Sequence, residues 1–456
     1  MATATTTRID TATATPIEMS DPMPADEGGI GVKVAVFGLG YVGLPLVRGC
    51  VETGHRVVGF DVDPDKVAGL RAGRSHVDDV DDAEISQWLA RGFTPTCDAG
   101  DLTDIDVYVI CVPSPLTKAG GPDLSYVEAA TRIIEETLSA TGANGGRGAN
   151  GARGERAKPL VVLESTTYPG TTEEVVKPIL EKNGLEAARD FHLVFSPERI
   201  DPGNKTWTFA NTPKVLGGLT PECAEAAAAF YAPMVVDVVV TKGLKEAEMA
   251  KLLENTYRHV NIALVNELWK LTQELGIDIW DVISAAETKP YGFQAFRPGP
   301  GVGGHCIPID PNYLSHRVKS ELGQPFRFVE LAQEVNASMP EFVIQRVQER
   351  LNEQGKSVNG SSVLLLGVTY KPDVADLRES PALPIVKGLA RRGSRVAFHD
   401  PYVDSIDVAG QTLQRVGDRD SAIAGADLVV LVQDHRDYRD IDTVVAPGRL
   451  LNTRGQ

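Results

Sequence analysis

The sequence predicts an α/β protein in which two parallel-sheet domains flank a long central helix. Three observations lead to this fold class. Short apolar runs alternate with helical patterns from Lys33 onward, the C-terminal part repeats the order of the N-terminal part, and a long helical pattern separates the two. Strands that alternate with helices are typical of parallel sheets covered by helices.

The first sheet is expected to begin with the apolar run 32–37, which ends at Gly38 and is followed by a helical pattern over 44–53. Because strands buried on both faces read as short, continuous apolar runs, the sheet should be parallel. Its further apolar runs are residues 56–60, 106–112, 160–164 and 191–195.

The C-terminal part repeats this order of elements. The run 363–366 ends at Gly367, as the first run of the chain ends at a glycine. The repeat predicts a second domain like the first, although no glycine-rich motif follows Gly367. The other matched segments are 395–400 with 56–61, and 426–432 with 105–110.

A long helix is expected over residues 245–276, because apolar side chains recur there at intervals of three and four. We interpret it as a spine between the domains and as part of a dimer surface, so that the chain would form a homodimer or a higher homo-oligomer. The alternative is a core helix within a monomer. The recurring side chains are Met249, Leu252, Leu253, Val260, Leu264, Leu268, Leu271 and Leu275.

The expected organisation begins with a disordered tail over 1–30, which is rich in Thr and Ala and then acidic and rich in proline. The first domain should span 31–217 and carry a flexible Gly-rich insertion at about 141–157. A central helical and dimerisation segment should span 218–340, and the second domain 341–456.

The composition excludes several classes of function. A net charge of −17 argues against a nucleic-acid partner, which would need a basic surface. Five cysteines without CxxC spacing fit a reducing compartment, so we expect a cytoplasmic protein. No apolar run approaches the length of a membrane helix, and the N-terminus lacks the pattern of a signal peptide, so no membrane partner is expected.

A dinucleotide site is expected at residues 38–43, which read G-x-G-x-x-G between a strand and a helix. Such a loop lets a pyrophosphate approach the backbone at a helix N-terminus. Asp61 ends the next strand, where a carboxylate can bind ribose hydroxyls and repel the 2′-phosphate of NADP, which favours NAD and a Rossmann-like, doubly wound domain. Lys66 is a further candidate for the cofactor, or a solvated lysine. The cofactor-binding residues within the loop are Gly38, Gly40, Tyr41, Val42 and Gly43.

The Gly- and Pro-rich segment 298–313 cannot form regular structure and should be a loop that approaches a ligand. It presents Cys306 and Asp310. A lone cysteine is more often a small buried hydrophobe, but this one lies in a ligand-binding loop. Zinc is not favoured, because His305 and Cys306 are neighbours and no second ligand pair is evident, so no metal site is expected.

Polar residues Lys251, Asn255 and Arg258 share one face of the central helix at spacing i, i+4, i+7. They form either a solvated stripe or a ligand site. Asn in the middle of a helix has low propensity, which is the argument for a ligand.

The chain resembles the UDP-glucose/UDP-N-acetylhexosamine 6-dehydrogenase family from about Lys33 to about Arg454. The motifs GLGYVGLPL, ESTTYPGTT, SPERIDPGN, KLLENTYRHVNIALVNEL, KPYGFQAF, PGPGVGGHCIPIDPNYL and GVTYKPDVADLRESP occur in the family's order. The resemblance implies an NAD-dependent oxidoreductase with an NAD-binding Rossmann domain, a helical dimerisation segment and a UDP-binding Rossmann-like domain.

The resemblance also implies roles for individual residues. Cys306 would be the nucleophile, and the other catalytic positions would be Lys251, Asn255, Asp310, Glu198 and Thr167. Further cofactor contacts would come from Ser114, Thr167 and Arg378. Substrate-binding positions would be Arg199, Ile200, Lys251, Asn255, Arg258, Gly303, Tyr370 and Lys371.

The GGHCIPIDP form looks most like UDP-N-acetylglucosamine 6-dehydrogenases, and UDP-N-acetylmannosamine dehydrogenases share GGHC. The expected reaction is therefore a four-electron oxidation of C6 of a UDP-N-acetylhexosamine through a thioester on Cys306. Oxidation of UDP-N-acetylmannosamine or UDP-glucose is the alternative. Readings from other classes are a two-electron hydroxy-acid dehydrogenase, which leaves Cys306 without a role, and a non-catalytic NAD-binding protein.

Overall fold

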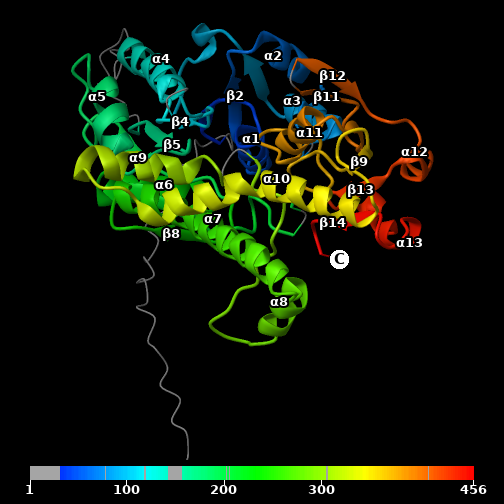
Figure 1. Cartoon of the computed structure of the whole chain (residues 1–456). Coiled ribbons are helices and arrows are strands. Elements are labelled where there is room, and N and C mark those ends of the chain that lie inside the picture. The colour runs from blue at the N-terminus through cyan, green and yellow to red at the C-terminus, as the bar shows by residue number, and fades with distance from the viewer. Residues whose placement is uncertain are drawn as a thin grey trace, which may run out of the picture.

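The computed structural model describes residues 31–77, 79–117, 120–141, 157–201, 203–204, 206–304, 307–408 and 410–455. The tail 1–30 and residues 142–156 of the Gly-rich insertion lie outside these ranges. Figure 1 shows a blue-to-green sheet unit and an orange-to-red sheet unit, with long green and yellow helices running along both.

Within the described residues, the first sheet has eight strands in the order β3-β2-β1-β4-β5-β6-β7-β8. Six of these strands are parallel, as expected, but β7 runs antiparallel to β6, so the prediction of an entirely parallel sheet is wrong at this edge. The sheet continues through β8, beyond the expected domain boundary at residue 217. The strands are β1 (Lys33–Phe37), β2 (Arg56–Phe60), β3 (Phe93–Thr96), β4 (Val107–Ile110), β5 (Leu160–Leu163), β6 (His192–Phe195), β7 (Lys214–Gly218) and β8 (Val238–Val240).

Two apolar cores cover the two faces of this sheet. Val34 and Val36 of β1 belong to one core, and Ala35 and Phe37 belong to the other, because successive strand side chains point to opposite faces. The helices of this unit are α1 (Gly43–Glu52), α2 (Pro64–Arg71), α3 (Asp82–Ala90), α4 (Ser125–Thr141), α5 (Lys177–Leu180) and α6 (Pro221–Tyr231).

Helix α7 (Leu244–Glu274) runs along the molecule beside α10 (Arg327–Glu353), and α8 (Ile279–Glu287) and α9 (Asp310–Leu322) complete the central segment (Figure 1). The buried side of α7 is mixed and contains polar as well as apolar residues. Buried positions include Glu248, Lys251, Asn255 and Asn266, which are polar. Of the expected apolar stripe, Leu252 is fully buried, whereas Met249, Leu253, Leu264, Leu268, Leu271 and Leu275 are exposed. No helix of the described residues is long and apolar enough to cross a membrane.

The second sheet unit has the parallel order β10-β9-β13-β14. Its strands are β9 (Ser362–Leu366), β10 (Arg395–His399), β13 (Leu428–Leu431) and β14 (Leu450–Asn452), with a separate hairpin of β11 (Ser405–Val408) and β12 (Gln411–Gln414). Helices α11 (Ala382–Arg391), α12 (Arg419–Gly425) and α13 (Ile441–Val444) belong to this unit.

The two sheet units carry the same carboxylate contact, which supports the internal repeat. Asp61 follows β2 and accepts hydrogen bonds from the amides of Leu39 and Asp63 at 2.9 and 3.0 Å. Asp400 follows β10 and accepts from the amides of Val368 and Tyr402 at 2.7 and 2.9 Å. In each unit the aspartate therefore fixes the loop that follows the adjacent central strand.

Candidate active site

The loop after β1 has room for a ligand beside one of its glycines. Gly38 adopts φ +91°, and a Cβ on Gly43 would lie 1.9 Å from the carbonyl oxygen of Gly38. Both positions therefore require glycine for the turn and for close packing of α1. A Cβ on Gly40 would meet no described atom within 4 Å. This glycine faces open space, which fits close approach of a dinucleotide pyrophosphate.

The start of α1 leaves its N-terminal charge available. Within the described residues no side chain caps this helix, and its first turn carries no acidic residue. The partial positive charge of a helix N-terminus favours an anion there. Asp61, at the end of β2, is buried beside the loop. Lys66 lies on α2, with its Nζ 3.9 Å from a carboxylate oxygen of Asp63.

Arg378 of the second sheet unit reaches the cofactor loop of the first. Its guanidinium lies 5.8 Å from the centre of the Tyr41 ring and forms a bidentate pair with Asp376. A cation over an aromatic face is attracted by the ring electrons. The two units therefore meet where the cofactor site was expected.

Helix α9 contacts the loop after β4 through Tyr313. This fully buried tyrosine donates a hydrogen bond to the carbonyl oxygen of Ser114 at 2.6 Å. Ser114 is itself buried. Because Tyr313 and Asp310 lie on the same helix, the contact places the start of α9 beside the expected cofactor contact.

Three of the expected catalytic residues come together between α7 and α9. Asn255 donates a hydrogen bond to Asp310 at 2.5 Å, and both side chains are buried, as is that of Lys251. Burial raises the pKa of Asp310 to about 6, although the charge of Lys251 and the hydrogen bond from Asn255 act in the opposite direction. A carboxyl group with this pKa can exchange a proton near neutral pH.

Glu198 is held from two sides. Its Oε1 accepts hydrogen bonds from the amides of Arg199 and Ile200 at 2.6 and 2.5 Å. Its Oε2 lies 3.5 Å from the ammonium of Lys214, which is also 2.9 Å from Glu164. The three charged groups are buried and form a line from β5 through β7 to the loop after β6.

The two carboxylates of this line share the single ammonium of Lys214. Burial lowers the pKa of Lys214, but Glu164 and Glu198 outweigh that effect and raise it above its ordinary value. Burial raises the pKa of Glu164, which also accepts a hydrogen bond from Tyr231 at 2.5 Å. Lys214 further lies 5.1 Å from the centre of the Tyr231 ring. A buried ammonium with two carboxylates fixes the geometry of Glu198.

Thr167 lies after β5 with a buried hydroxyl. Its Oγ1 has no hydrogen-bond partner among the described residues. Since buried polar groups are nearly always hydrogen-bonded, such a hydroxyl is suited to contact a ligand or a water molecule.

Other expected substrate residues form a cluster where the sheet units meet. The ammonium of Lys371 lies 2.7 Å from Asp201, and the charge of Arg258 also acts on that carboxylate and helps to lower its pKa against the opposing effect of burial. Arg199 points elsewhere, to Glu254 at 2.8 Å and to the carbonyl oxygen of Pro213. Ile200 is half-buried.

The Gly-rich loop of the central segment packs against Tyr370. A Cβ on Gly303 would lie 2.6 Å from the Cβ of Tyr370, and Gly304 accepts no Cβ because the tyrosine ring lies beside it. The loop is anchored by Asn266, which accepts a hydrogen bond from the amide of Gly299 at 2.9 Å. His305 and Cys306 lie outside the described residues, so the assignment of Cys306 as nucleophile stays a prediction.

Lys214, Tyr313 and Asn266 were missed by the sequence reasoning. Lys214 begins a strand and carries no local motif. Tyr313 is the last residue of the Gly- and Pro-rich segment, and Asn266 lies within a helical pattern. The signal available in the sequence was a polar residue, Lys214 or Asn266, at a position that the surrounding apolar pattern predicts to be buried.

Two nucleotide-binding units that meet across a polar helix define a class of dinucleotide-dependent oxidoreductases. The chain matches three consecutive domains of one family: the NAD binding domain over residues 32–235, the central domain over 245–338 and the UDP binding domain over 364–454. It belongs to the UDP-glucose/GDP-mannose dehydrogenase family and is an NAD-dependent UDP-sugar dehydrogenase.

Named relatives cover most of the chain. It is 38% identical to a UDP-N-acetyl-D-glucosamine 6-dehydrogenase of Pseudomonas aeruginosa, over 82% of this chain and 84% of the relative. It is 33% identical to a UDP-N-acetyl-D-mannosamine dehydrogenase of Methanocaldococcus jannaschii, over 91% and 89% of the two chains. The solved UDP-D-ManNAc dehydrogenase from Pyrococcus horikoshii superposes with a TM-score of 0.80 at 30% identity, over 92% and 95%.

Proposed function

We propose that this enzyme oxidises C6 of a UDP-N-acetylhexosamine to the carboxylate in a four-electron reaction, with UDP-N-acetylglucosamine as its substrate. The support for the sugar is the 38% identity to the P. aeruginosa UDP-N-acetyl-D-glucosamine 6-dehydrogenase together with the longer GGHCIPIDP form of the motif. UDP-N-acetylmannosamine is the second candidate, because relatives named for that sugar match more of the chain.

The observation that carries the mechanism is the buried group of Lys251, Asn255 and Asp310, which joins a proton acceptor to two hydrogen-bond donors. In the sequence, Cys306 comes shortly before Asp310. A thiol, a base and donors for a negatively charged oxygen are the groups that conversion of an alcohol into an acid requires.

We assign the steps as follows. Asp310 would take the proton of the C6 hydroxyl as C6 gives up a hydride, which yields the aldehyde. Cys306 would add to the aldehyde to give a thiohemiacetal, and loss of a second hydride and of the hydroxyl proton would convert that adduct to a thioester. Lys251 and Asn255 stabilise the negative oxygen of the tetrahedral states. Glu198, fixed by Lys214, orients the water that hydrolyses the thioester, with Thr167 beside it. NAD, when bound at the loop after β1, supplies the hydride acceptor for both oxidations.

Binding of the UDP moiety is assigned to the second sheet unit and its neighbours. Lys371 and Arg258 supply positive charge for the pyrophosphate. The ammonium of Lys371 lies 2.7 Å from Asp201, and the charge of Arg258 also acts on that carboxylate, so both cations act on the same part of the site. Tyr370 and Gly303, which pack against each other, would line the same site together with Ile200.

The assembly we propose is a homodimer formed through the exposed apolar face of α7. Leu264, Leu268, Leu271 and Leu275 lie at successive turns of this helix and are between 39% and 71% exposed. Large contiguous apolar surfaces usually mark an interface. A second copy of the chain is the partner that the expected dimerisation segment implies.

The test is the number of NADH molecules formed per sugar, measured in parallel with UDP-glucose, UDP-N-acetylglucosamine and UDP-N-acetylmannosamine. The proposal expects two NADH per sugar, with UDP-N-acetylglucosamine as the preferred substrate. One NADH per sugar would leave Cys306 without its role. Two NADH with another of the sugars would keep the mechanism and correct the substrate.

A further inference from the structure

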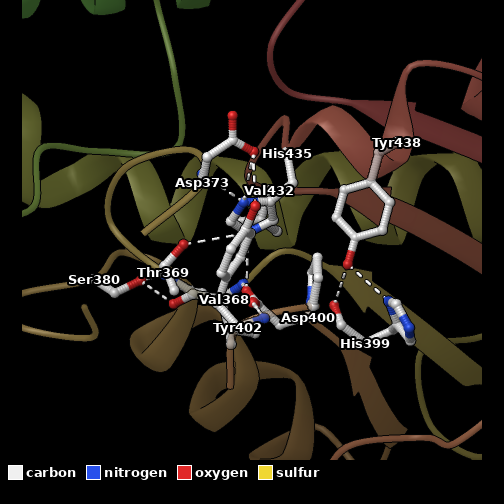
Figure 2. A network of polar contacts seen from close by, with 12 residues as sticks. Val368, Thr369, Asp373, Ser380, His399, Asp400, Tyr402, Val432, His435 and Tyr438 are labelled. Carbon is white, nitrogen blue, oxygen red and sulfur yellow. Dashed lines mark hydrogen bonds and ion pairs between the residues drawn. The ribbon is translucent and has the colours of Figure 1, made fainter. Parts of the chain in front are cut away.

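A buried histidine lies behind the loop that carries Tyr370 and Lys371. His435 follows β13 and is 1% exposed. Figure 2 shows it between Asp400, Thr369 and Asp373. Its Nε2 lies 3.0 Å from a carboxylate oxygen of Asp400 and 3.3 Å from the hydroxyl oxygen of Thr369, and its Nδ1 accepts a hydrogen bond from the amide of Asp373 at 2.9 Å.

The partners of His435 define which nitrogen carries the proton. A backbone amide can only donate, so Nδ1 must be the acceptor from Asp373. Nε2 then carries the hydrogen and points it at the Asp400 carboxylate, with the Thr369 oxygen as a second acceptor. Thr369 donates its own hydroxyl hydrogen to the carbonyl oxygen of Lys371 at 2.9 Å. Its oxygen can therefore accept the hydrogen of Nε2, so each contact of this network joins a donor to an acceptor.

The residue held by this histidine has an unusual backbone. Asp373 adopts φ +61°, a left-handed conformation that costs free energy for a residue other than glycine. Its carboxylate accepts a hydrogen bond from the amide of Arg436 at 3.0 Å, and Arg436 also pairs with it through its guanidinium. Contacts with His435 and Arg436 therefore hold the end of the 368–373 loop in a conformation that it would not adopt by itself.

The same position in the first sheet unit is open to the cofactor. Ser114 follows β4, and His435 follows β13. The two positions correspond, because β4 pairs with β1 in the first unit and β13 pairs with β9 in the second. Asp61 remains 8% exposed, whereas Asp400 is fully buried beneath His435. In the second unit, the imidazole thus contacts the aspartate whose counterpart in the first unit is partly exposed.

We propose that His435, oriented by Asp400, is a positioning residue for the UDP site, because it holds the 368–373 loop so that Lys371 faces Asp201 of the first sheet unit. The proposal rests on the assignment of Lys371 to UDP binding. The histidine contacts no ligand itself and acts through the Asp373 amide and the Thr369 hydroxyl.

Two substitutions of His435 test the roles of its two ring nitrogens separately. His435→Asn keeps an oxygen acceptor near the Nδ1 position, whereas His435→Gln keeps a donor near Nε2 but removes the acceptor for Asp373. Calorimetric titration with UDP alone should give an affinity within about threefold of the parent for His435→Asn and about tenfold weaker, or about 1.4 kcal/mol, for His435→Gln. The affinity for NAD should not change in either variant.

Control variants distinguish a positioning role of His435 from a general loss of stability of the second sheet unit. His399→Gln alters the contact of His399 with Tyr438 at 2.8 Å in the same sheet unit but not the loop, so UDP affinity should be retained. Asp373→Gly keeps the amide donor and tolerates the positive φ, and should also retain it. In combination with Lys371→Ala, His435→Gln should cost little more than Lys371→Ala alone, because both act through one group.

Three results would overturn the inference: equal UDP affinity of the parent and His435→Gln, equal losses in the Asn and Gln variants, or additive losses with Lys371→Ala. If the parent binds UDP and Lys371→Ala does not weaken binding, the assignment of Lys371 itself fails. Because UDP binding needs no turnover, these outcomes are independent of which sugar is oxidised and of the role of Cys306.

Discussion

Asn255 of α7 donates a hydrogen bond of 2.5 Å to Asp310, the first residue of α9. The contact joins the helix that carries Lys251 to the chain that follows Cys306. The carboxyl group of Asp310 is buried at this contact, and burial raises its pKa to about 6. Most of the proposed chemistry depends on this one relationship.

The pH dependence of the reaction should report Asp310. If its ionised form accepts a proton from the substrate, kcat/KM should fall as the pH drops below about 6, where the carboxyl becomes protonated. Asp310→Asn should lose activity and should have no such limb in any residual rate. A pH profile of the variant with an unchanged acidic limb would assign that limb to another group.

The same substitution should stabilise the fold. The pKa of Asp310 is about 6 in the folded state, against about 3.9 in the unfolded state. The folded state therefore binds the proton more tightly, and the free energy of unfolding should fall as the pH rises from about 4 to about 6. At pH 7.5, Asp310→Asn should be more stable than the parent by about 1–3 kcal/mol, and the difference should vanish below about pH 4. Urea titrations at the two pH values measure this.

Two glycines of the cofactor loop should respond differently to alanine. A Cβ at position 40 meets no described atom within 4 Å, whereas one at position 43 would lie 1.9 Å from the oxygen of Gly38. Gly40→Ala should keep the melting temperature and raise KM for NAD by about tenfold or more, since the methyl group would displace a pyrophosphate. Gly43→Ala should lower the melting temperature. Unchanged NAD affinity in Gly40→Ala would move the cofactor away from this loop.

Cys306 should be required for acid formation. Cys306→Ala should form no uronic acid, and Cys306→Ser should accumulate an ester that hydrolyses slowly. Cys97→Ala is the matched control, because that thiol is free and exposed in the first sheet unit. Mass spectrometry of the intact protein after a single turnover would detect the ester. Normal acid formation by Cys306→Ala would exclude the covalent mechanism.

Lys214 should contribute strongly to the stability of the folded protein, although it lies in none of the sequence motifs. Lys214→Met leaves Glu164 and Glu198 buried without their counter-charge, and loss of one partner of a buried pair costs about 3–5 kcal/mol. Adding Glu164→Gln should restore part of that stability, because it removes one of the two charges. Denaturant titrations of the single and double variants give both values. Equal stability of the two variants would argue that the carboxylates do not share the ammonium.

The apolar face of α7 should be an interface between two copies. Leu271 is 55% exposed on this face, and Leu271→Asp should convert a dimer to a monomer, with half the mass by light scattering. Val444→Asp, at an exposed position of the second sheet unit, should keep the parent mass. If the parent protein is a monomer, the proposal that these leucines form a dimer interface is wrong.

Local patterns were sufficient for most strands of the two sheets and for the length of the central helix. They did not reveal β3, β7, β8 or β14. The strand 56–60 was predicted at its observed limits. The expected helix 245–276 corresponds closely to α7, Leu244–Glu274. These features depend on residues close together in the chain, since alternation of apolar runs, glycine spacing and helical periodicity are all short-range signals. The sequence alone thereby determined the fold class and the domain that binds NAD, and it predicts the cofactor loop within that domain.

Tertiary structure alone decided which polar residues meet. Lys214 contacts Glu164 and Glu198, and His435 contacts Asp373 and Asp400, across long separations in the chain. It also decided which side of α7 is hidden. Lys251 and Asn255 are buried there together with apolar residues such as Leu252. Most leucines of the predicted apolar stripe are exposed instead. The physical reason is that periodicity reveals that two faces differ, whereas the burial of a charged side chain depends on a partner that only the folded chain brings to it.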